Sequence, residues 1–116
     1  MIELTKAEEA LMQILWKEQK AFIKDIIEQM PEPKPAYTTV STFIRILEKK
    51  GAVGHTSFGK SHQYYPIISQ LEYKKQSIKK LLHTYFDDSV PSLFSFFTKE
   101  KILSDEELKE LKKLIK

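Results

Sequence analysis

This chain of 116 residues contains no cysteine and no long apolar run, and it has only three glycines. The absence of cysteine excludes disulfides, thiolate metal sites and cysteine nucleophiles, and it fits a reducing compartment. No apolar run approaches the ~20 residues that a membrane-spanning helix needs, so we expect no membrane insertion. The segment after Met1 is amphipathic and capped, unlike a signal peptide, and we therefore expect a cytoplasmic protein.

The sequence also lacks the patterns of common catalytic and cofactor sites. Three glycines are too few for a glycine-rich phosphate loop, and neither an HExxH motif nor a Ser–His–Asp ordering is present. His55 and His62 flank a predicted hairpin turn and could approach each other, but no carboxylate adjoins either of them in the sequence. Such histidines are more often solvated or hydrogen-bonded than metal-bound. We therefore predict that the protein is not an enzyme and that it needs no metal or cofactor.

What the sequence does have is an uneven distribution of charge. The formal net charge of +3 is by itself a weak indication of a partner. Between residues 34 and 65, however, there are five cations and a single acid, Glu48. The cations are Lys34, Arg45, Lys49, Lys50 and Lys60. Most of the positive charge therefore lies in one segment, where it can attract a polyanion.

Residues 1–68 have the pattern of a winged helix-turn-helix. Thr5 and Glu8 form a capping box before a helix over about 6–17. Its apolar positions are Ala7, Leu11, Ile14 and Leu15. An extended joint, "KAF", leads to a second short helix, "IKDIIEQMP", and a third helix over about 37–50 ends at Gly51. The stretch "AVGHTSFGKSHQYYP" then predicts a hairpin with its turn at "FGKS", so we expect a wing of two or three strands.

The third predicted helix is rich in small hydroxyl side chains. Its apolar stripe, at i, i+3, i+4 and i+7, consists of Val40, Phe43, Ile44 and Leu47. The polar residues must then face away from the core, where short hydroxyl side chains allow a helix to enter the major groove of DNA. The predicted DNA-binding residues are Tyr37, Thr38, Thr39, Ser41, Thr42, Arg45 and Lys49 on this helix and Lys60 at the hairpin tip.

Residues 69–116 are predicted to form three further helices. A capping box at Ser69 and Glu72 begins a long helix, Ser89 begins a shorter one, and a box at Ser104 and Glu107 begins the last. The stretch is short for an independent core and rich in aromatic residues, so we expect a second copy of the chain to complete it. The predicted dimerisation residues are Leu81, Tyr85, Leu93, Phe94, Phe97, Leu108 and Leu111.

Four stretches resemble the penicillinase repressor family of winged-helix transcriptional repressors, of the BlaI/MecI/CopY type. They are "LTKAEEALMQILW", "TVSTFIRILEKKG", "HQYYPIIS" and "SLFSFFTKEKILSDEELKELKKLI", in family order and across nearly the whole chain. The resemblance implies a homodimeric repressor that binds a palindromic operator in double-stranded DNA through its winged helices. The family often has lysine and arginine where this chain has Thr38 and Ser41, so a different operator sequence is expected.

The same resemblance implies a route of release from DNA. In the penicillinase branch, a membrane sensor metallopeptidase triggers cleavage of the repressor between asparagine and phenylalanine, which weakens the dimer. That bond aligns with Phe96–Phe97 here, where Phe96 replaces the asparagine. A sensor-protease or another signal is therefore expected to inactivate the repressor, and Phe96–Phe97 is the candidate cleavage site.

Two other functions fit parts of the sequence. A ligand-sensing winged helix would hold an effector among C-terminal aromatics such as Phe86, Phe94, Phe96 and Phe97, although aromatics at helical spacing more often form a core. A winged helix that binds only protein is the other alternative. The salt dependence of binding distinguishes a protein-binding winged helix from a DNA-binding one, because affinity for phosphates falls steeply as the salt concentration rises.

Overall fold

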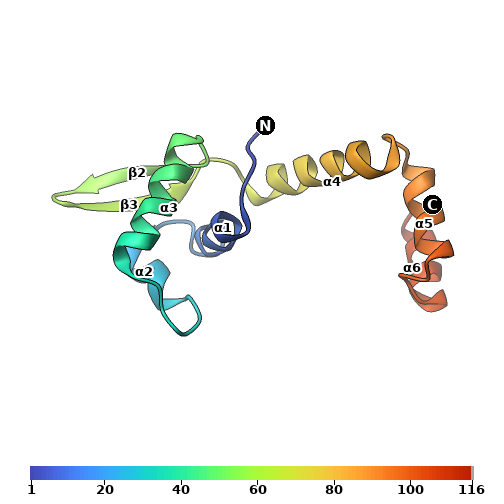
Figure 1. The fold of residues 1–116 in the computed structure, drawn as a ribbon, viewed down its shortest axis with the longest axis horizontal. Helices are drawn as coiled ribbons and strands as arrows, with labels where there is room; N and C mark the ends of the chain where they lie inside the picture. The colour runs from blue at the N-terminus through green and yellow to red at the C-terminus, as the bar shows by residue number, and fades with distance from the viewer. Residues whose placement is uncertain (116) are drawn as a thin grey trace. The chain divides into compact units, whose positions relative to one another are not determined.

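The computed structural model describes residues 1–115, which divide into two compact units, Met1–Tyr73 and Lys74–Lys116. The first unit contains α1 (Lys6–Glu18), β1 (Ala21–Phe22), α2 (Ile23–Glu28), α3 (Tyr37–Lys49), β2 (Val53–Phe58) and β3 (Ser61–Pro66) (Figure 1). Then follow α4 (Gln70–Phe86), α5 (Val90–Lys99) and α6 (Asp105–Ile115). The predicted fold, a winged helix followed by three helices, is confirmed.

Local capping signals fix the ends of these helices. At the start of α1, the Thr5 N–H donates to Glu8 Oε1 and the Glu8 N–H donates to Thr5 Oγ1, as the predicted capping box requires. At the C-terminal end of α3, Gly51 adopts a φ of 84°, which a residue without a side chain accepts at little cost. Gly51 therefore ends the helix where the sequence predicts.

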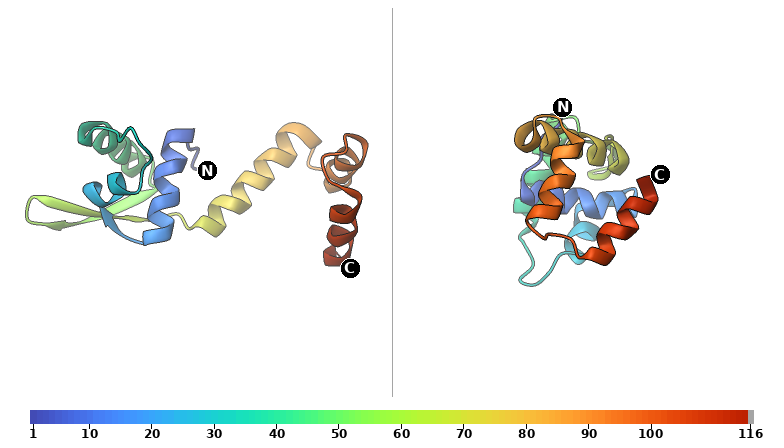
Figure 2. Two further views of the ribbon diagram at one scale, coloured as in Figure 1. Left: turned by 90° about the horizontal axis from the view of Figure 1, so that it is seen from below. Right: turned by 90° about the vertical axis from the view of Figure 1, so that its right-hand side faces the viewer.

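The wing is part of a three-stranded antiparallel sheet in the order β1-β3-β2. Phe58 pairs with Ser61, so Gly59 and Lys60 form a two-residue turn, and Gly59 has the positive φ of 62° that such turns favour. Ala21 pairs with Tyr64 and thereby turns the expected extended joint into the third strand. Figure 2 shows the β2–β3 hairpin extending beyond the helices of its own unit. Lys60 lies in the turn that joins its two strands.

The core of the first unit lies between its helices and the sheet. Fully buried side chains come from each of the helices α1 to α3 and from the start of the wing, and include Leu11, Met12, Leu15, Ile26, Val40, Ile44, Leu47 and Val53. The predicted apolar stripe of α1 was wrong at Ala7 and left out two buried residues. Ala7 is exposed, whereas Met12 and the side chain of Glu8 are buried. The core stripe of α1 is therefore rotated toward Glu8, whose carboxylate is paired with Lys50 at the end of α3.

Helices α4 to α6, the first of which begins in the first unit, have well-formed starts and exposed faces. The Glu72 N–H donates to Ser69 Oγ, the Ser92 N–H to Ser89 Oγ and the Glu107 N–H to Ser104 Oγ, which confirms the three predicted starts. None of the helices described in residues 1–115 is both long and apolar enough to cross a membrane. The division into a DNA-binding part (1–68) and a dimerisation part (69–116) stays a prediction.

Candidate nucleic-acid interface

Helix α3 turns one face to the core and another to solvent. Val40, Ile44 and Leu47 are at most 1% exposed and Phe43 packs against them, which confirms the predicted apolar stripe. The exposed residues of the predicted interface on this helix are Tyr37, Thr38, Thr39, Thr42, Arg45 and Lys49, and Ser41 is half-buried. Because the hydroxyl side chains are short, the backbone of α3 can approach a ligand closely along this outward face.

Thr42 shows what the outward face offers chemically. Its Oγ1 donates a hydrogen bond to the carbonyl oxygen of Thr38, 2.9 Å away. The hydroxyl proton is thereby used inside the helix, so the exposed side chain presents oxygen lone pairs and a methyl group. A lone pair can accept from a base amino group and a methyl can meet the methyl of thymine.

A small cavity separates α3 from the wing, and we call it the wing notch. Its volume is about 160 Å³, and its lining residues are Ile23, Tyr37, Ser41, Arg45, Lys60, His62 and Tyr64. The notch brings together four of the predicted interface residues: Tyr37, Ser41, Arg45 and Lys60. The other four, Thr38, Thr39, Thr42 and Lys49, remain on the outward face of α3.

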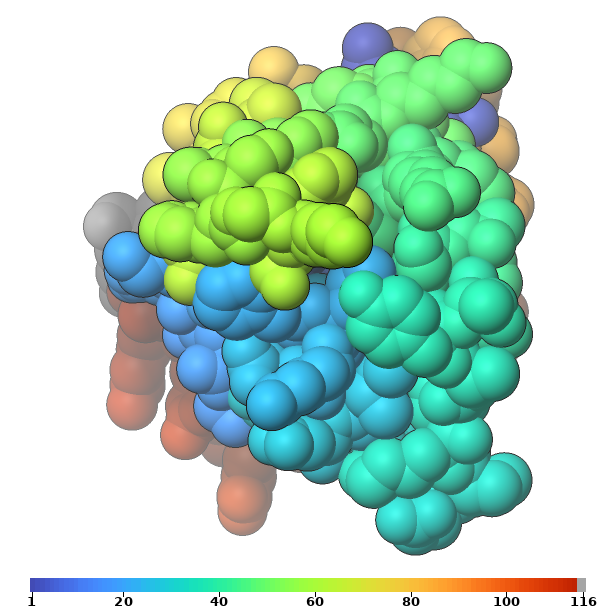
Figure 3. All heavy atoms as spheres, turned by 90° about the vertical axis from the view of Figure 1, so that its left-hand side faces the viewer, coloured from blue at the N-terminus to red at the C-terminus, as the bar shows by residue number. Residues whose placement is uncertain are grey.

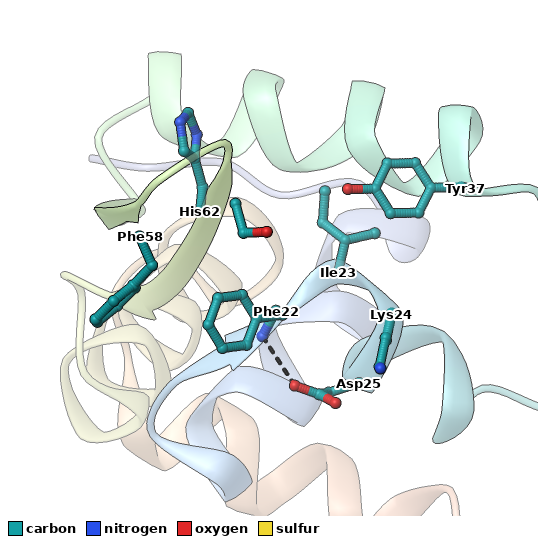
Figure 4. A pocket seen from close by; sticks show the side chains of 8 residues that line it. Phe22, Ile23, Lys24, Asp25, Tyr37, Phe58 and His62 are labelled. Atoms are coloured by element: carbon teal, nitrogen blue, oxygen red, sulfur yellow. Dashed lines mark hydrogen bonds between the residues drawn. The ribbon is translucent and has the colours of Figure 1, made fainter.

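A larger groove of about 520 Å³ adjoins the notch, because both are lined by Ile23, Tyr37 and His62. Figure 4 shows Phe58 and His62 on the wing, Tyr37 at the start of α3, and Phe22 and Ile23 between them. The rings of Phe22 and Phe58 meet edge to face with centroids 6.0 Å apart. Figure 3 shows the face on which the wing, α2 and the start of α3 come together. The groove is therefore aromatic on the wing side and polar toward α2.

The five cations counted in the sequence are not equally available at this face. Lys34 donates to the carbonyl oxygens of Glu28 and Met30, 3.0 Å and 2.7 Å away, and so holds the loop after α2. Lys50, counted in the sequence among the cations that can attract a polyanion, instead reaches across to Glu3 and Glu8 at the start of the chain. The positive charge of the outward face and the notch therefore comes from Arg45, Lys49 and Lys60, which are all exposed.

Lys50 and Glu8 form an ion pair that the sequence did not reveal. The Lys50 ammonium lies 2.6 Å from Glu8 Oε1 and also donates to the carbonyl oxygen of Glu3 at 2.9 Å. The Glu8 side chain is only 3% exposed, and that of Lys50 is 33% exposed. Burial opposes the charge of Glu8, but hydrogen bonds from Lys50 and Thr5 outweigh it and hold the pKa of Glu8 below its usual value. The pair fixes the end of α3 to the start of α1.

The wing contributes two histidines and a tyrosine that face α3. The imidazoles of His55 and His62 stack in parallel with centroids 4.1 Å apart, which confirms that they approach each other. His55 Nδ1 contacts a carboxylate oxygen of Glu48 on α3. Burial, followed by the charge of Glu48, raises the pKa of the Tyr64 phenol, so it stays neutral. Alternation on β3 places His62 and Tyr64 on one face, and this signal could have added both residues to the predicted site.

The predicted dimerisation residues lie on helices α4 to α6 and keep much of their surface exposed. Leu81 and Tyr85 are exposed, and Leu93, Phe94, Phe97, Leu108 and Leu111 are half-buried. The ring centroids of Phe94 and Phe97 lie 6.3 Å apart, and those of Phe86 and Phe96 lie 5.6 Å apart. Phe96 is 42% exposed, and the Phe96–Phe97 bond lies inside α5. These aromatics thus form small clusters within one chain.

Comparison with known proteins gives four consistent likenesses. The model of a family described as "Penicillinase repressor" matches residues 4–116. The methicillin resistance regulatory protein MecI of Staphylococcus aureus is 28% identical over 114 residues, covering 97% of this chain and 93% of that protein. The penicillinase repressor of Bacillus licheniformis is 25% identical over 114 residues, covering 97% and 89%. The solution structure of the DNA binding domain of the repressor BlaI matches 62% of this chain and 89% of that domain, with a TM-score of 0.55 and 26% identity.

Proposed function

The chain belongs to the penicillinase repressor family, and we propose that it is a homodimeric transcriptional repressor that binds a palindromic DNA operator. The observation that carries the proposal is the face of α3: a buried apolar stripe on one side and exposed Thr38, Thr39 and Thr42 on the other. In a winged helix of this family, that slim face is the part suited to the major groove. Relatives of the chain bear the names of regulatory proteins and repressors, not of enzymes.

In this proposal, residues at the start of α3 contact bases and a residue at its end contacts the DNA backbone. Thr38 and Thr39 lie in its first turn, the end that usually points at base edges, and Thr42 follows one turn later with its acceptor and methyl group. Lys49 lies in the last turn, where it contacts a backbone phosphate. Half-sites are then separated by one helical turn of DNA, about 34–36 Å, or a multiple of it.

The second part of the proposal is dimerisation through α4 to α6. Helices α4 and α5 contain no buried residue, and several of their large apolar side chains are exposed, including Ile78, Leu81, Tyr85 and Phe96. Faces of this kind are normally covered by a partner. A second copy presents the same faces and satisfies them symmetrically. Linking two winged helices in this way raises the affinity for a palindrome without any new contact to DNA.

The third part concerns release from the operator. We propose that a signal, such as cleavage triggered by a membrane sensor metallopeptidase, separates the dimer. The Phe96–Phe97 bond lies within α5, whose backbone is closed by helical hydrogen bonds such as that from the Glu100 N–H to the Phe96 carbonyl. A protease acts on extended, exposed backbone, so α5 has to open locally before the bond can be cut.

Titration of labelled duplexes tests the DNA-binding part of the proposal. A duplex enriched from a random pool by the protein and a random-sequence duplex of equal length are titrated at 50 mM and 200 mM salt, with anisotropy as the readout. We expect tighter binding of the enriched duplex and a loss of about 10³-fold or more between the two salt concentrations. Binding that does not respond to salt or to sequence contradicts the proposal.

A charge substitution on α3 then locates the interface. Thr42→Glu places a carboxylate on the outward face, where it is repelled by the phosphates, and we expect specific binding to fall below detection. Ala10→Glu is the matched control, because it adds the same charge at an exposed position of α1. Equal binding by the two variants would remove α3 from the interface.

A further inference from the structure

The geometry points to a single DNA backbone phosphate bound in the wing notch by Arg45 and Lys60, with His62 as a third, proton-dependent cation. The inference rests on the proposed function and assigns this part of the interface its own ligand and its own pH dependence. It also assigns Arg45 to a backbone phosphate, whereas the outward face of α3 contacts the bases.

The notch has the size and lining of an anion site. Its volume of about 160 Å³ is several times the ~30 Å³ that one water molecule occupies in the liquid. Arg45 enters from α3 and Lys60 from the wing turn, so two cations reach it from opposite walls. Ser41 and Tyr64 add hydroxyl groups that can donate hydrogen bonds. Donors from two walls match the several oxygens of a phosphate.

Arg45 is placed differently from the threonines of α3. Thr38 and Thr42 are absent from the lining of the notch, whereas Arg45 lines it together with the wing residues Lys60 and His62. Tyr64 of β3 lines the same notch, so Arg45 has residues of the wing beside it. A side chain directed this way meets the DNA strand that runs between helix and wing. It therefore contributes affinity for any sequence and carries no preference for a base.

His62 makes the charge of the notch depend on pH. Histidine is the side chain that ordinarily gains a proton between pH 8 and pH 5. His62 lines both the notch and the adjoining groove, where the neighbouring cations are Arg45, Lys60 and Lys24 and the neighbouring acid is Asp25. Asp25 already accepts a hydrogen bond from the Phe22 N–H at 3.2 Å. Tyr37 and Tyr64 complete the titratable surroundings on this side.

The stacked partner of His62 limits the proton uptake to one. His55 lies parallel to His62 at 4.1 Å and contacts Glu48, the acid of α3 that faces the wing. Two imidazolium rings at this distance repel each other. His55 is in contact with Glu48, whereas Asp25, the acid that lines the groove with His62, already accepts from the Phe22 N–H. The phosphate supplies the missing negative charge for His62 when DNA is bound. Lowering the pH therefore adds one cation to the notch in the complex, and binding strengthens.

Salt dependence at two pH values tests this, with the enriched duplex and the random-sequence duplex as probes. At pH 8, Arg45→Ala and Lys60→Gln should each lower the affinity for both duplexes about tenfold. Each should also make the slope of log K against log salt less steep by about one. The matched control is Lys6→Gln, an exposed lysine at the start of α1. A loss confined to one base pair of the enriched duplex, with an unchanged slope, would make Arg45 a base reader and overturn the assignment.

The histidine variants separate the two imidazoles. Between pH 8 and pH 6, the wild-type protein should bind about tenfold more tightly, with a slope steeper by about 0.9. His62→Gln should abolish this gain in affinity, and His62→Lys should bind equally tightly at both pH values. His55→Gln and the remote control His83→Gln should keep the gain. Loss of the gain in His55→Gln but not in His62→Gln would contradict the role of His62.

A scan of the DNA backbone identifies the phosphate itself. Each phosphate of the enriched duplex is replaced in turn by an uncharged methylphosphonate. At one position per half-site, the wild-type protein should lose as much affinity as Lys60→Gln loses, and Lys60→Gln should lose nothing further. Additive losses at every position would overturn the notch assignment. The proposed repressor function would survive that result as long as Thr42→Glu still abolished binding, and it would fail if the wild-type protein ignored DNA.

Discussion

The two units of the chain differ in how they cover their apolar side chains. Every buried apolar residue among the described residues belongs to Met1–Tyr73, whereas α4 and α5 contain no buried residue. The sequence of each unit is nevertheless amphipathic and well capped. Capping and periodicity thus produce helices in both units. Within residues 1–115, only the first unit has a sheet and enough crossing helices to enclose a core within one chain. The second unit is therefore the part that the proposed second copy would cover.

The largest expected effect comes from placing a charge in the core of the first unit. Ile44 is fully buried on α3, and Ile44→Asp puts an unpaired carboxylate there. We expect the winged helix to unfold, at a cost above ~4 kcal/mol, because a buried charge without a partner is among the most damaging substitutions. Circular dichroism and sedimentation should then report a dimer that has lost the structure of one unit.

Ile46→Asp is the matched control for that experiment. Ile46 lies two residues further along α3 and is 39% exposed, so the same new charge remains in contact with water. We expect a small change in melting temperature. If both variants melted like the wild-type protein, the first unit would not owe its stability to its own core, and the comparison between the units would fail.

A charge in the second unit should separate the copies and leave the winged helix folded. Leu93 and Leu111 are half-buried within one chain, and Leu93→Asp or Leu111→Asp places a carboxylate in the predicted dimer contact. We expect monomers at micromolar concentration and a fall in operator occupancy of about 10²–10⁴-fold, because the two winged helices no longer bind as one linked pair.

Sedimentation velocity and the anisotropy titration measure the two consequences. Ser92→Asp is the control, because Ser92 is exposed and adjoins Leu93 in the first turn of α5, where an acid is tolerated. Dimers that persist in both leucine variants would show that α5 and α6 are not the contact.

How much of this contrast the sequence predicts depends on the range of the interactions. Capping boxes such as Ser104 with Glu107 join residues three apart, and each predicted start is present. The stripe on α3 is similarly local. The pairing of Lys50 with Glu8 joins residues 42 apart, and neither residue's spacing indicates it. A charge count over residues 34–65 therefore overstates the cations that can meet DNA.

The candidate site follows the same rule. The outward face of α3 could be predicted because one helix determines it. The wing notch could not, because it depends on the register of β2 and β3 and on their approach to α3. The turn at Gly59 and Lys60 sets that register, which places His62 and Tyr64 on the same side as His55. Those tertiary placements, more than composition, decide which cations share a ligand.

A smaller effect is expected from the ion pair that fixes α3 to α1. Glu8→Gln keeps an acceptor for the Thr5 N–H but removes the negative charge beside Lys50. We expect a loss of about 1–3 kcal/mol in the free energy of unfolding at pH 7, toward the lower end because Lys50 is partly solvated. Urea unfolding measures the loss, with Glu9→Gln as the neighbouring control. A change no larger than that of the control would contradict a stabilising role for the pair.

The ion pair also predicts the direction of a pH dependence. The pKa of Glu8 is lower in the folded protein than the ordinary value of 4.5. Its contribution is therefore complete above that value and is lost as the pH falls through the lower, folded value, because the unfolded chain then binds the proton first. We expect the stability of the wild-type protein to fall more steeply than that of Glu8→Gln between pH 5 and acid conditions. Parallel curves would remove Glu8 from the acid response.

The smallest expected effect lies at the end of the first unit, where Trp16 of α1 holds the segment before α4. Its indole Nε1–H donates to the carbonyl oxygen of Ile68 at 2.9 Å, and its ring lies 5.7 Å from that of Tyr73. Trp16→Phe keeps an aromatic ring and removes the donor, so the Ile68 carbonyl loses its partner. We expect a loss of about 0.5–1.5 kcal/mol. Amide exchange should rise over residues 68–73, the last part of the first unit. Unchanged exchange there would show that Trp16 does not anchor the start of α4.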